Sequence, residues 1–124
     1  MGYESKLFIV HKNANTNYDK KKKGYADFIV SIDLSKCYSF SDWMRKKKEA
    51  DCYIYMDDGN TQILEDKYGK PLTEASVEDV LEHLKKAEKI DSYRRYRLAI
   101  DIMQSFVDHK EDWGGGLAVL HYGY

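Results

Sequence analysis

The sequence has little proline, little cysteine and no long apolar run. One proline and two cysteines in 124 residues argue against a proline-rich disordered chain. Cys37 and Cys52 are spaced neither as a redox pair nor as a zinc-binding motif, and we expect no structural disulfide between them. No apolar run approaches the roughly 18 to 20 residues that cross a bilayer. We therefore expect one cytoplasmic domain over residues 1–124 with no membrane segment.

Motifs that carry catalysis or bind metals are missing as well. The run from Gly114 to Gly116 lacks the lysine of a phosphate-binding loop, and a predicted strand follows it in place of a helix. The four histidines fall on different predicted elements, so no two of them form a helical metal pair. His11 and His121 would approach each other if the terminal strands pair, and Asp33 would complete an acid–base group suited to a hydrolase. This is the least favoured of three hypotheses, and we predict no catalytic residue, no metal and no cofactor.

Hydrophobic periodicity predicts eight elements in the order β-β-α-β-β-α-α-β. Strands are expected at residues 6–12, 25–34, 52–56, 61–64 and 117–122, and helices at residues 42–50, 76–90 and 92–109. Helices that are separated from hairpin-type strands indicate the α+β class, with an antiparallel or mixed sheet of about five strands and two to three helices on one face. The first and last strands are the most apolar, so we expect them to lie adjacent in the middle of the sheet.

The residues around Asp58-Gly59 carry the clearest local signal. This dipeptide favours the left-handed backbone of a two-residue hairpin turn. With the dipeptide as the loop, Ile54 faces Ile63 and Tyr53 faces Leu64. Apolar residues therefore face one another, and the register of the hairpin is self-consistent.

The second strand and the first long helix each show one apolar side. Phe28, Val30 and Ile32 alternate along the strand, which predicts that they share a buried face. An apolar stripe at helical spacing runs along the helix. Ser76 precedes the helix and, with Asp79 three residues later, resembles a capping box.

Acidic and basic residues are unevenly distributed, although the formal net charge is −1. Residues 1–48 carry eleven basic and five acidic side chains, whereas residues 49–82 carry two basic and ten acidic ones. The acidic middle also contains tyrosines, which suit binding surfaces because each has an apolar ring and a polar tip. Such a surface can dock into a basic groove on a nucleic-acid enzyme. We predict that a partner protein is bound by Tyr53, Tyr55, Asp57, Asp58, Asn60, Glu65 and Asp66.

A basic segment supports an alternative hypothesis. Cationic and aromatic residues are mixed at the start of the last predicted helix, as they are in sites for single-stranded nucleic acid. The alternative function is a homo-oligomer that sequesters a small nucleotide, or an accessory protein that binds nucleic acid. Its ligand contacts would be Arg94, Arg95, Tyr96 and Arg97. Against nucleic acid, the sequence pI is near 6.4, and successive helical residues splay apart.

Several short stretches carry a resemblance to a known class of proteins. These stretches are MGYESKL (1–7), YIY (53–55), DDGNT (57–61), LED (64–66), WG (113–114) and LHYG (120–123). Together they resemble small accessory proteins encoded by phages and mobile elements of Gram-positive bacteria. The resemblance implies a protein that modulates a host enzyme or blunts a host defence system, as anti-CRISPR-type proteins do. The first hypothesis is therefore a binding protein that inhibits or modulates a host macromolecule, such as a defence nuclease, through the acidic, tyrosine-rich surface.

Overall fold

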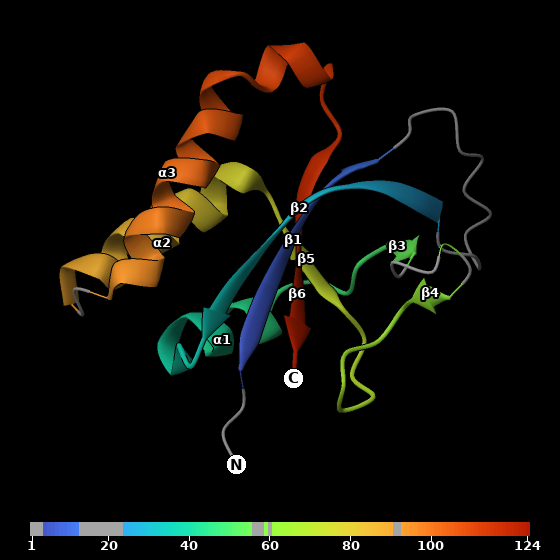
Figure 1. Cartoon of the computed structure of the whole chain (residues 1–124), viewed down its shortest axis with the longest axis horizontal. Helices are drawn as coiled ribbons and strands as arrows, with labels where there is room; N and C mark the ends of the chain where they lie inside the picture. Colours follow the sequence, from blue (N-terminus) through green and yellow to red (C-terminus); the bar gives the residue numbers. More distant parts are fainter. Residues whose placement is uncertain (1–3, 13–23, 56–58, 60, 91–92) are drawn as a thin grey trace.

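The computed structural model describes residues 4–12, 24–55, 59, 61–90 and 93–124, and it confirms the predicted α+β class (Figure 1). In chain order the elements are β1 (Ser5–Lys12), β2 (Gly24–Ser35), α1 (Tyr38–Arg45), β3 (Cys52–Tyr55), β4 (Gln62–Ile63), β5 (Thr73–Ala75), α2 (Val77–Ile90), α3 (Arg94–Asp108), a 3₁₀ turn (Lys110–Trp113) and β6 (Leu117–Gly123). The sequence does not predict β5, because this three-residue strand has no apolar alternation.

The six strands form one mixed sheet in the order β4-β3-β2-β1-β6-β5. Strand β1 pairs antiparallel with both β2 and β6, so the two terminal strands are adjacent and central, as predicted. They occupy this position because their side chains are the most apolar of all the strands. The predicted pairing of Ile54 with Ile63 is confirmed between β3 and β4. The turn residues 57, 58 and 60 lie outside the described residues.

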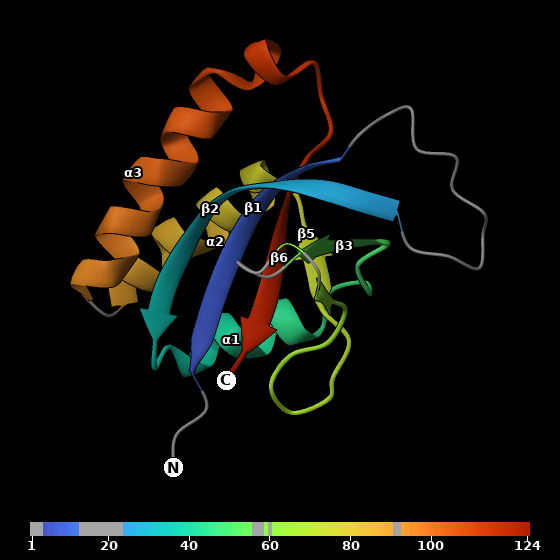
Figure 2. The same cartoon turned by 45° about the vertical axis from the view of Figure 1, so that its right-hand side comes forward.

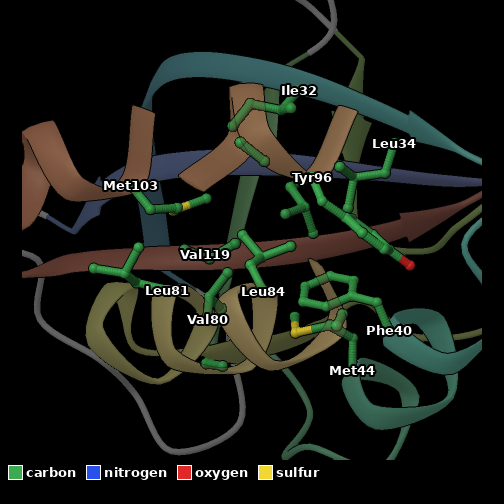
Figure 3. Close-up of a cluster of buried hydrophobic side chains, with 14 of the residues drawn as sticks. Ile32, Leu34, Phe40, Met44, Val80, Leu81, Leu84, Tyr96, Met103 and Val119 are labelled. Atoms are coloured by element: carbon green, nitrogen blue, oxygen red, sulfur yellow. The ribbon is translucent and has the colours of Figure 1, made fainter. Parts of the chain in front are cut away.

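All three helices contribute side chains to a core on one face of the sheet (Figure 3). Leu7 and Ile9 of β1 point into this core, together with Val119 of β6. The apolar stripe of α2 and the buried side of α3 cover them, and Figures 1 and 2 show these two helices side by side. Ser76 caps α2 as predicted, because its Oγ accepts a hydrogen bond from the Asp79 backbone N–H at 3.1 Å.

The opposite face of the sheet is buried as well. Phe8 and Val10 of β1 and Leu120 of β6 point into a second core. Cys52 and Ile54 of β3, a strand of the same sheet, belong to this core as well. The uninterrupted apolar runs of the two central strands reflect burial on both faces, since a strand with one solvent-exposed face alternates apolar and polar residues.

A β-bulge in β2 corrects one sequence prediction. Ile9 pairs with Val30 and Val10 pairs with Phe28, so Ile29 is the extra residue between the two pairs. The extra residue turns Phe28 to the face opposite Val30. Phe28 is 49% exposed and contacts Phe8 edge to face, with ring centroids 5.8 Å apart. The prediction that Phe28 shares the buried face with Val30 is therefore wrong.

Helix α1 begins and ends earlier than the predicted residues 42–50. It ends because residues beyond Arg45 turn to pair with β5. Glu49 forms a bridge with Thr73, and the Ala50 backbone N–H donates to the Leu72 carbonyl at 2.8 Å. The long-range backbone pairing therefore outweighs the helical propensity of the lysine run that follows Arg45.

Two glycines before β6 differ in how tightly the chain packs around them. Both have a left-handed backbone, with φ of +61° at Gly114 and +83° at Gly116. A Cβ on Gly116 would lie 2.9 Å from the Lys12 carbonyl oxygen, whereas a Cβ on Gly114 meets nothing within 4 Å.

We expect Gly114→Ala to destabilise the fold by about 1 kcal/mol through backbone strain alone. Gly116→Ala should cost clearly more in urea unfolding, and equal losses for the two variants would contradict this packing.

Candidate functional site

Three tyrosine rings form a cluster on the outer side of β2 and β3. The ring centroids of Tyr25 and Tyr53 lie 6.0 Å apart, those of Tyr25 and Tyr55 lie 5.3 Å apart, and those of Tyr53 and Tyr55 lie 5.5 Å apart. Tyr25 and Tyr55 are each 37% exposed. We call Tyr25, Tyr53 and Tyr55 the tyrosine cluster.

The strand geometry explains why these rings meet. Successive side chains on a strand point to opposite faces, and Cys52 and Ile54 are buried, so Tyr53 and Tyr55 point outward. Parallel pairing of β2 with β3 places Tyr25 beside Tyr53. The cluster is therefore held by backbone pairing between segments that are distant in the sequence.

Burial and hydrogen bonding raise the pKa of two tyrosines of the cluster, Tyr25 and Tyr53. Burial and a hydrogen bond with Asp27 raise the pKa of Tyr25 above its ordinary value. A hydrogen bond with Tyr55, followed by desolvation, raises the pKa of Tyr53. At neutral pH these tyrosines present ring faces and hydroxyl groups, which suit recognition of a partner.

The residues predicted to bind a partner are partly brought together. Tyr53 and Tyr55 lie in the cluster, whereas Asp57, Asp58 and Asn60 lie outside the described residues. Glu65 is exposed on the loop that follows β4, and Asp66 stabilises that loop. Tyr25 and Asp27 were not among the residues predicted to bind a partner. Their alternation at the start of β2 was visible, but the parallel pairing that brings them to β3 was not.

The alternative ligand residues do not form one surface. Tyr96 is only 3% exposed and packs in the helical core, so it cannot stack on a ligand. Arg97 lies 3.7 Å from Glu88 of α2. Arg95 donates to the Asp33 carbonyl oxygen at 2.8 Å and faces β2. The helix therefore distributes these side chains around its circumference, as its geometry requires.

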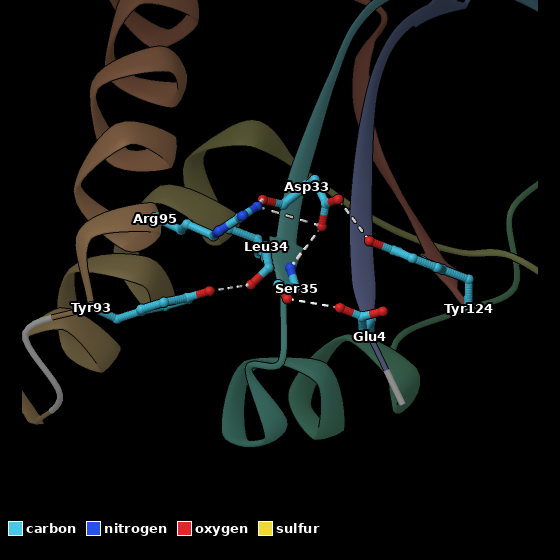
Figure 4. A network of polar contacts seen from close by, with 7 residues as sticks. All are labelled: Glu4, Asp33, Leu34, Ser35, Tyr93, Arg95 and Tyr124. Carbon is cyan, nitrogen blue, oxygen red and sulfur yellow. Dashed lines mark hydrogen bonds and ion pairs between the residues drawn. The ribbon is translucent and has the colours of Figure 1, made fainter. Parts of the chain in front are cut away.

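A polar network joins the end of β2 to α3 and to the C-terminal residue (Figure 4). The Tyr124 hydroxyl donates to the Asp33 carboxylate at 2.6 Å, and the Ser35 backbone N–H donates to the same carboxylate at 2.8 Å. Ser35 in turn donates to Glu4 at 2.8 Å. Burial raises the pKa of Asp33, but these hydrogen bonds and the charge of Arg95 outweigh it and lower the pKa overall. The ionised Asp33 thus connects the end of β2 with α3 and with Tyr124.

The histidines predicted to form an acid–base group are kept apart by the register of the terminal strands. His11 pairs with Leu117 and His121 pairs with Leu7, so the two histidines are separated by four strand positions, or about 13 Å. The His11 Nε2 lies 2.8 Å from the Trp113 carbonyl oxygen, and the His121 Nε2 lies 2.9 Å from the Ser5 hydroxyl. The prediction that the histidines converge is therefore wrong. Their separation removes the basis of the hydrolase hypothesis.

Comparisons with known proteins give no relative for this chain. No protein-family model, no curated protein and no solved structure matches it. Within the described ranges, no group of three or more His, Cys, Asp or Glu side chains is placed to hold a metal ion. In the same part of the chain, no helix has the length and apolar character needed to cross a membrane.

Proposed function

We propose that this protein is a binding protein that inhibits or modulates a macromolecule in the cytoplasm of a host, and that the tyrosine cluster is its contact surface. The observation that carries the proposal is the packing of three partly exposed tyrosine rings on one outer side of the sheet. Tyrosine dominates many binding surfaces because it contributes a large contact area at a low cost in side-chain entropy. Strand pairing holds the rings in place before a partner binds, which lowers that cost further.

The charge around the cluster supports a basic partner. Asp27 is exposed and contacts Tyr25. In the sequence, Asp57 and Asp58 follow Tyr55 closely, and Glu65 is exposed beyond β4. An acidic group beside an aromatic surface, as Asp27 is beside Tyr25, steers a positively charged groove toward that surface. A nuclease has such a groove, and the resemblance to phage and mobile-element accessory proteins supports a host defence nuclease as the partner.

The test compares capture by the parent protein and by Tyr53→Ala/Tyr55→Ala. A protein that the immobilised parent retains from a Gram-positive host lysate is identified, and its dissociation constant is measured. We expect the double variant to bind at least about tenfold more weakly, since aromatic anchors commonly contribute more than about 1.4 kcal/mol. Asp27→Asn should slow association at low salt more than at high salt.

Two control variants show whether the right surface has been chosen. Tyr68→Ala removes an exposed tyrosine outside the cluster and should leave the affinity unchanged. Arg94→Gln/Arg97→Gln removes charges from α3 and should also have no effect. If the tyrosine double variant binds as well as the parent while the arginine variant fails, the contact surface lies on α3, and the nucleotide or nucleic-acid hypothesis replaces this one.

A further inference from the structure

A cavity of about 500 Å³ lies between the end of α1, the loop that joins β4 to β5, and β6. Arg45 and Lys47 line it from the α1 side, Tyr68 and Lys70 from the loop, and His121 from β6. Its volume falls within the range of about 300–1,000 Å³ that is typical of small-molecule sites. None of these residues belongs to the tyrosine cluster.

The charge of the cavity lining favours an anion. Three cations, Arg45, Lys47 and Lys70, line the cavity beside two carboxylates, Glu49 and Asp66. Arg45 also pairs with Asp42, and the Lys47 Nζ lies 4.3 Å from the centre of the Trp43 ring, so a bound anion would share these two cations with their present partners. The Asp66 carboxylate is already engaged, because it accepts hydrogen bonds from two loop backbone N–H groups, of Tyr68 at 2.8 Å and of Lys70 at 3.0 Å. These bonds hold the Asp66 carboxylate against the loop backbone, and its charge still offsets one of the three cations.

The negative end of helix α1 also faces this region, but its carbonyl groups have partners. The Met44 carbonyl oxygen accepts a hydrogen bond from the Thr73 hydroxyl at 2.8 Å and from the Lys47 backbone N–H at 3.1 Å. The helix dipole is thus opposed by local donors and by the Arg45 guanidinium in the last turn.

Backbone hydrogen bonds hold the loop that carries Tyr68. The Asp66 backbone N–H donates to the Lys70 carbonyl at 2.8 Å, and the Lys67 backbone N–H donates to the Gly123 carbonyl at 3.0 Å. The first of these bonds closes the loop, and the second ties it to the end of β6. Tyr68 lies between these anchors and is 51% exposed. Its ring is therefore positioned to stack on a planar group without a large loss of loop entropy.

The buried wall of the cavity is polar and uncharged at neutral pH. His121 is 3% exposed, and burial lowers its pKa to about 4, with a smaller opposing influence from Asp66. The ring is held by the hydrogen bond between its Nε2 and the Ser5 hydroxyl. A negatively charged ligand beside this ring would favour its protonated form, so His121 can report on occupancy.

We propose that this cavity binds an aromatic anion of the mononucleotide class, with the planar ring against Tyr68 and the phosphate among Arg45, Lys47 and Lys70. Guanidinium and ammonium groups form charge-assisted hydrogen bonds with phosphate oxygens, and aromatic side chains stack on bases of any type. This site differs from the arginines at the start of α3, where the sequence pattern predicts nucleotide contacts.

The test titrates the full chain with AMP, with adenosine and with inorganic phosphate, followed by two-dimensional NMR and calorimetry. We expect AMP to bind with a dissociation constant below about 1 mM, and adenosine and phosphate to bind at least about tenfold more weakly. Resonances of Tyr68, Lys70 and His121 should shift, and bound AMP should raise the pKa of His121. Arg45→Gln/Lys70→Gln should weaken AMP binding at least about tenfold. Tyr68→Phe should retain binding that Tyr68→Ala loses.

Matched controls make the proposal falsifiable. Arg94→Gln and Tyr53→Ala/Tyr55→Ala should leave AMP binding unchanged, and each variant is first checked by its amide spectrum for an intact fold. If no resonance shift approaches saturation when AMP is added to about 10 mM, the proposal is overturned. Shifts confined to α3, equal affinity for phosphate and AMP, or full AMP binding by Arg45→Gln/Lys70→Gln would also overturn it. None of these results depends on capture of a protein partner, so failure here is distinct from failure of the proposed function.

Discussion

A chain that ends at Gly116 is expected not to fold. This truncation removes β6, which pairs with both β1 and β5 and contributes Ala118, Val119 and Leu120 to the two cores. Burial of one large aliphatic side chain contributes about 1.5–3 kcal/mol, and the total stability of a domain is about 5–15 kcal/mol. The loss of a central strand also leaves the backbone groups of β1 without partners on that side. Circular dichroism and urea titration should therefore show no cooperative unfolding transition.

Point variants in β6 test the same strand without deleting it. Val119 faces the helical core and Leu120 faces the second core, and both are fully buried. Leu120→Ala should lower the free energy of unfolding by about 2–5 kcal/mol, and Val119→Ala should lower it by a smaller amount. Leu98→Ala, on the exposed side of α3, should change it by less than about 0.5 kcal/mol. A Leu120→Ala variant as stable as the parent would show that the second face of the sheet is not a core.

Lys12→Met is expected to destabilise the fold by about 3 kcal/mol at neutral pH. The Lys12 Nζ lies 2.6 Å from the carboxylate of Glu74 and 2.8 Å from that of Asp51. Glu74 is only 4% exposed, and the exposed Lys48 lies 3.9 Å from its carboxylate. The carboxylate also accepts a hydrogen bond from the Asp51 backbone N–H at 3.2 Å. Removal of Lys12 therefore leaves a buried carboxylate with weak compensation. Lys12→Met/Glu74→Met should recover most of the loss, since both buried charges are then absent.

The control for this prediction is the same substitution in an exposed ion pair. Lys86→Met breaks an ion pair on the surface of α2, in which the Lys86 Nζ lies 3.4 Å from the Glu82 carboxylate. Both side chains are about 70% exposed. Such pairs contribute about 0.5 kcal/mol or less, so this variant should be nearly as stable as the parent. Equal losses in Lys12→Met and Lys86→Met, measured by urea unfolding, would contradict a special role for the buried pair.

The difference in the free energy of unfolding between the parent and Lys12→Met should depend on pH, because the pKa values of Lys12 and Asp51 are shifted in the folded state. Burial raises the pKa of Asp51, but hydrogen bonding and charge interaction with Lys12 lower it more. The contribution of the Asp51 carboxylate to the free energy of unfolding is therefore present above its pKa in the unfolded chain, about 4. It disappears as the pH falls through the lower pKa that Asp51 has in the folded protein. Burial lowers the pKa of Lys12, but Asp51 and Glu74 raise it more. The contribution of Lys12 to the free energy of unfolding is therefore complete below its pKa in the unfolded chain, about 10.4. It disappears as the pH rises through the higher pKa that Lys12 has in the folded protein.

Local sequence patterns were sufficient to predict most of the elements and the centre of the sheet. The apolar residues Leu7 to Val10 and those of the last strand predict that the two strands lie in the middle of the sheet, and the structure places them adjacent. The hairpin pairing of Ile54 with Ile63 follows from the turn dipeptide between them. Short-range periodicity and turn chemistry depend only on neighbouring residues, so they can be derived before the fold is known.

The tertiary structure decided which of these elements meet. Parallel pairing brings Tyr25 to Tyr53, the bulge at Ile29 turns Phe28 away from the helical core, and the register separates His11 from His121. The cavity likewise combines the end of α1, a loop and β6, which are distant in the chain. Periodicity shows which side of an element is apolar, but not which partner covers that side or in which register. Those choices depend on the packing of both sheet faces at once, and they determine both candidate binding sites.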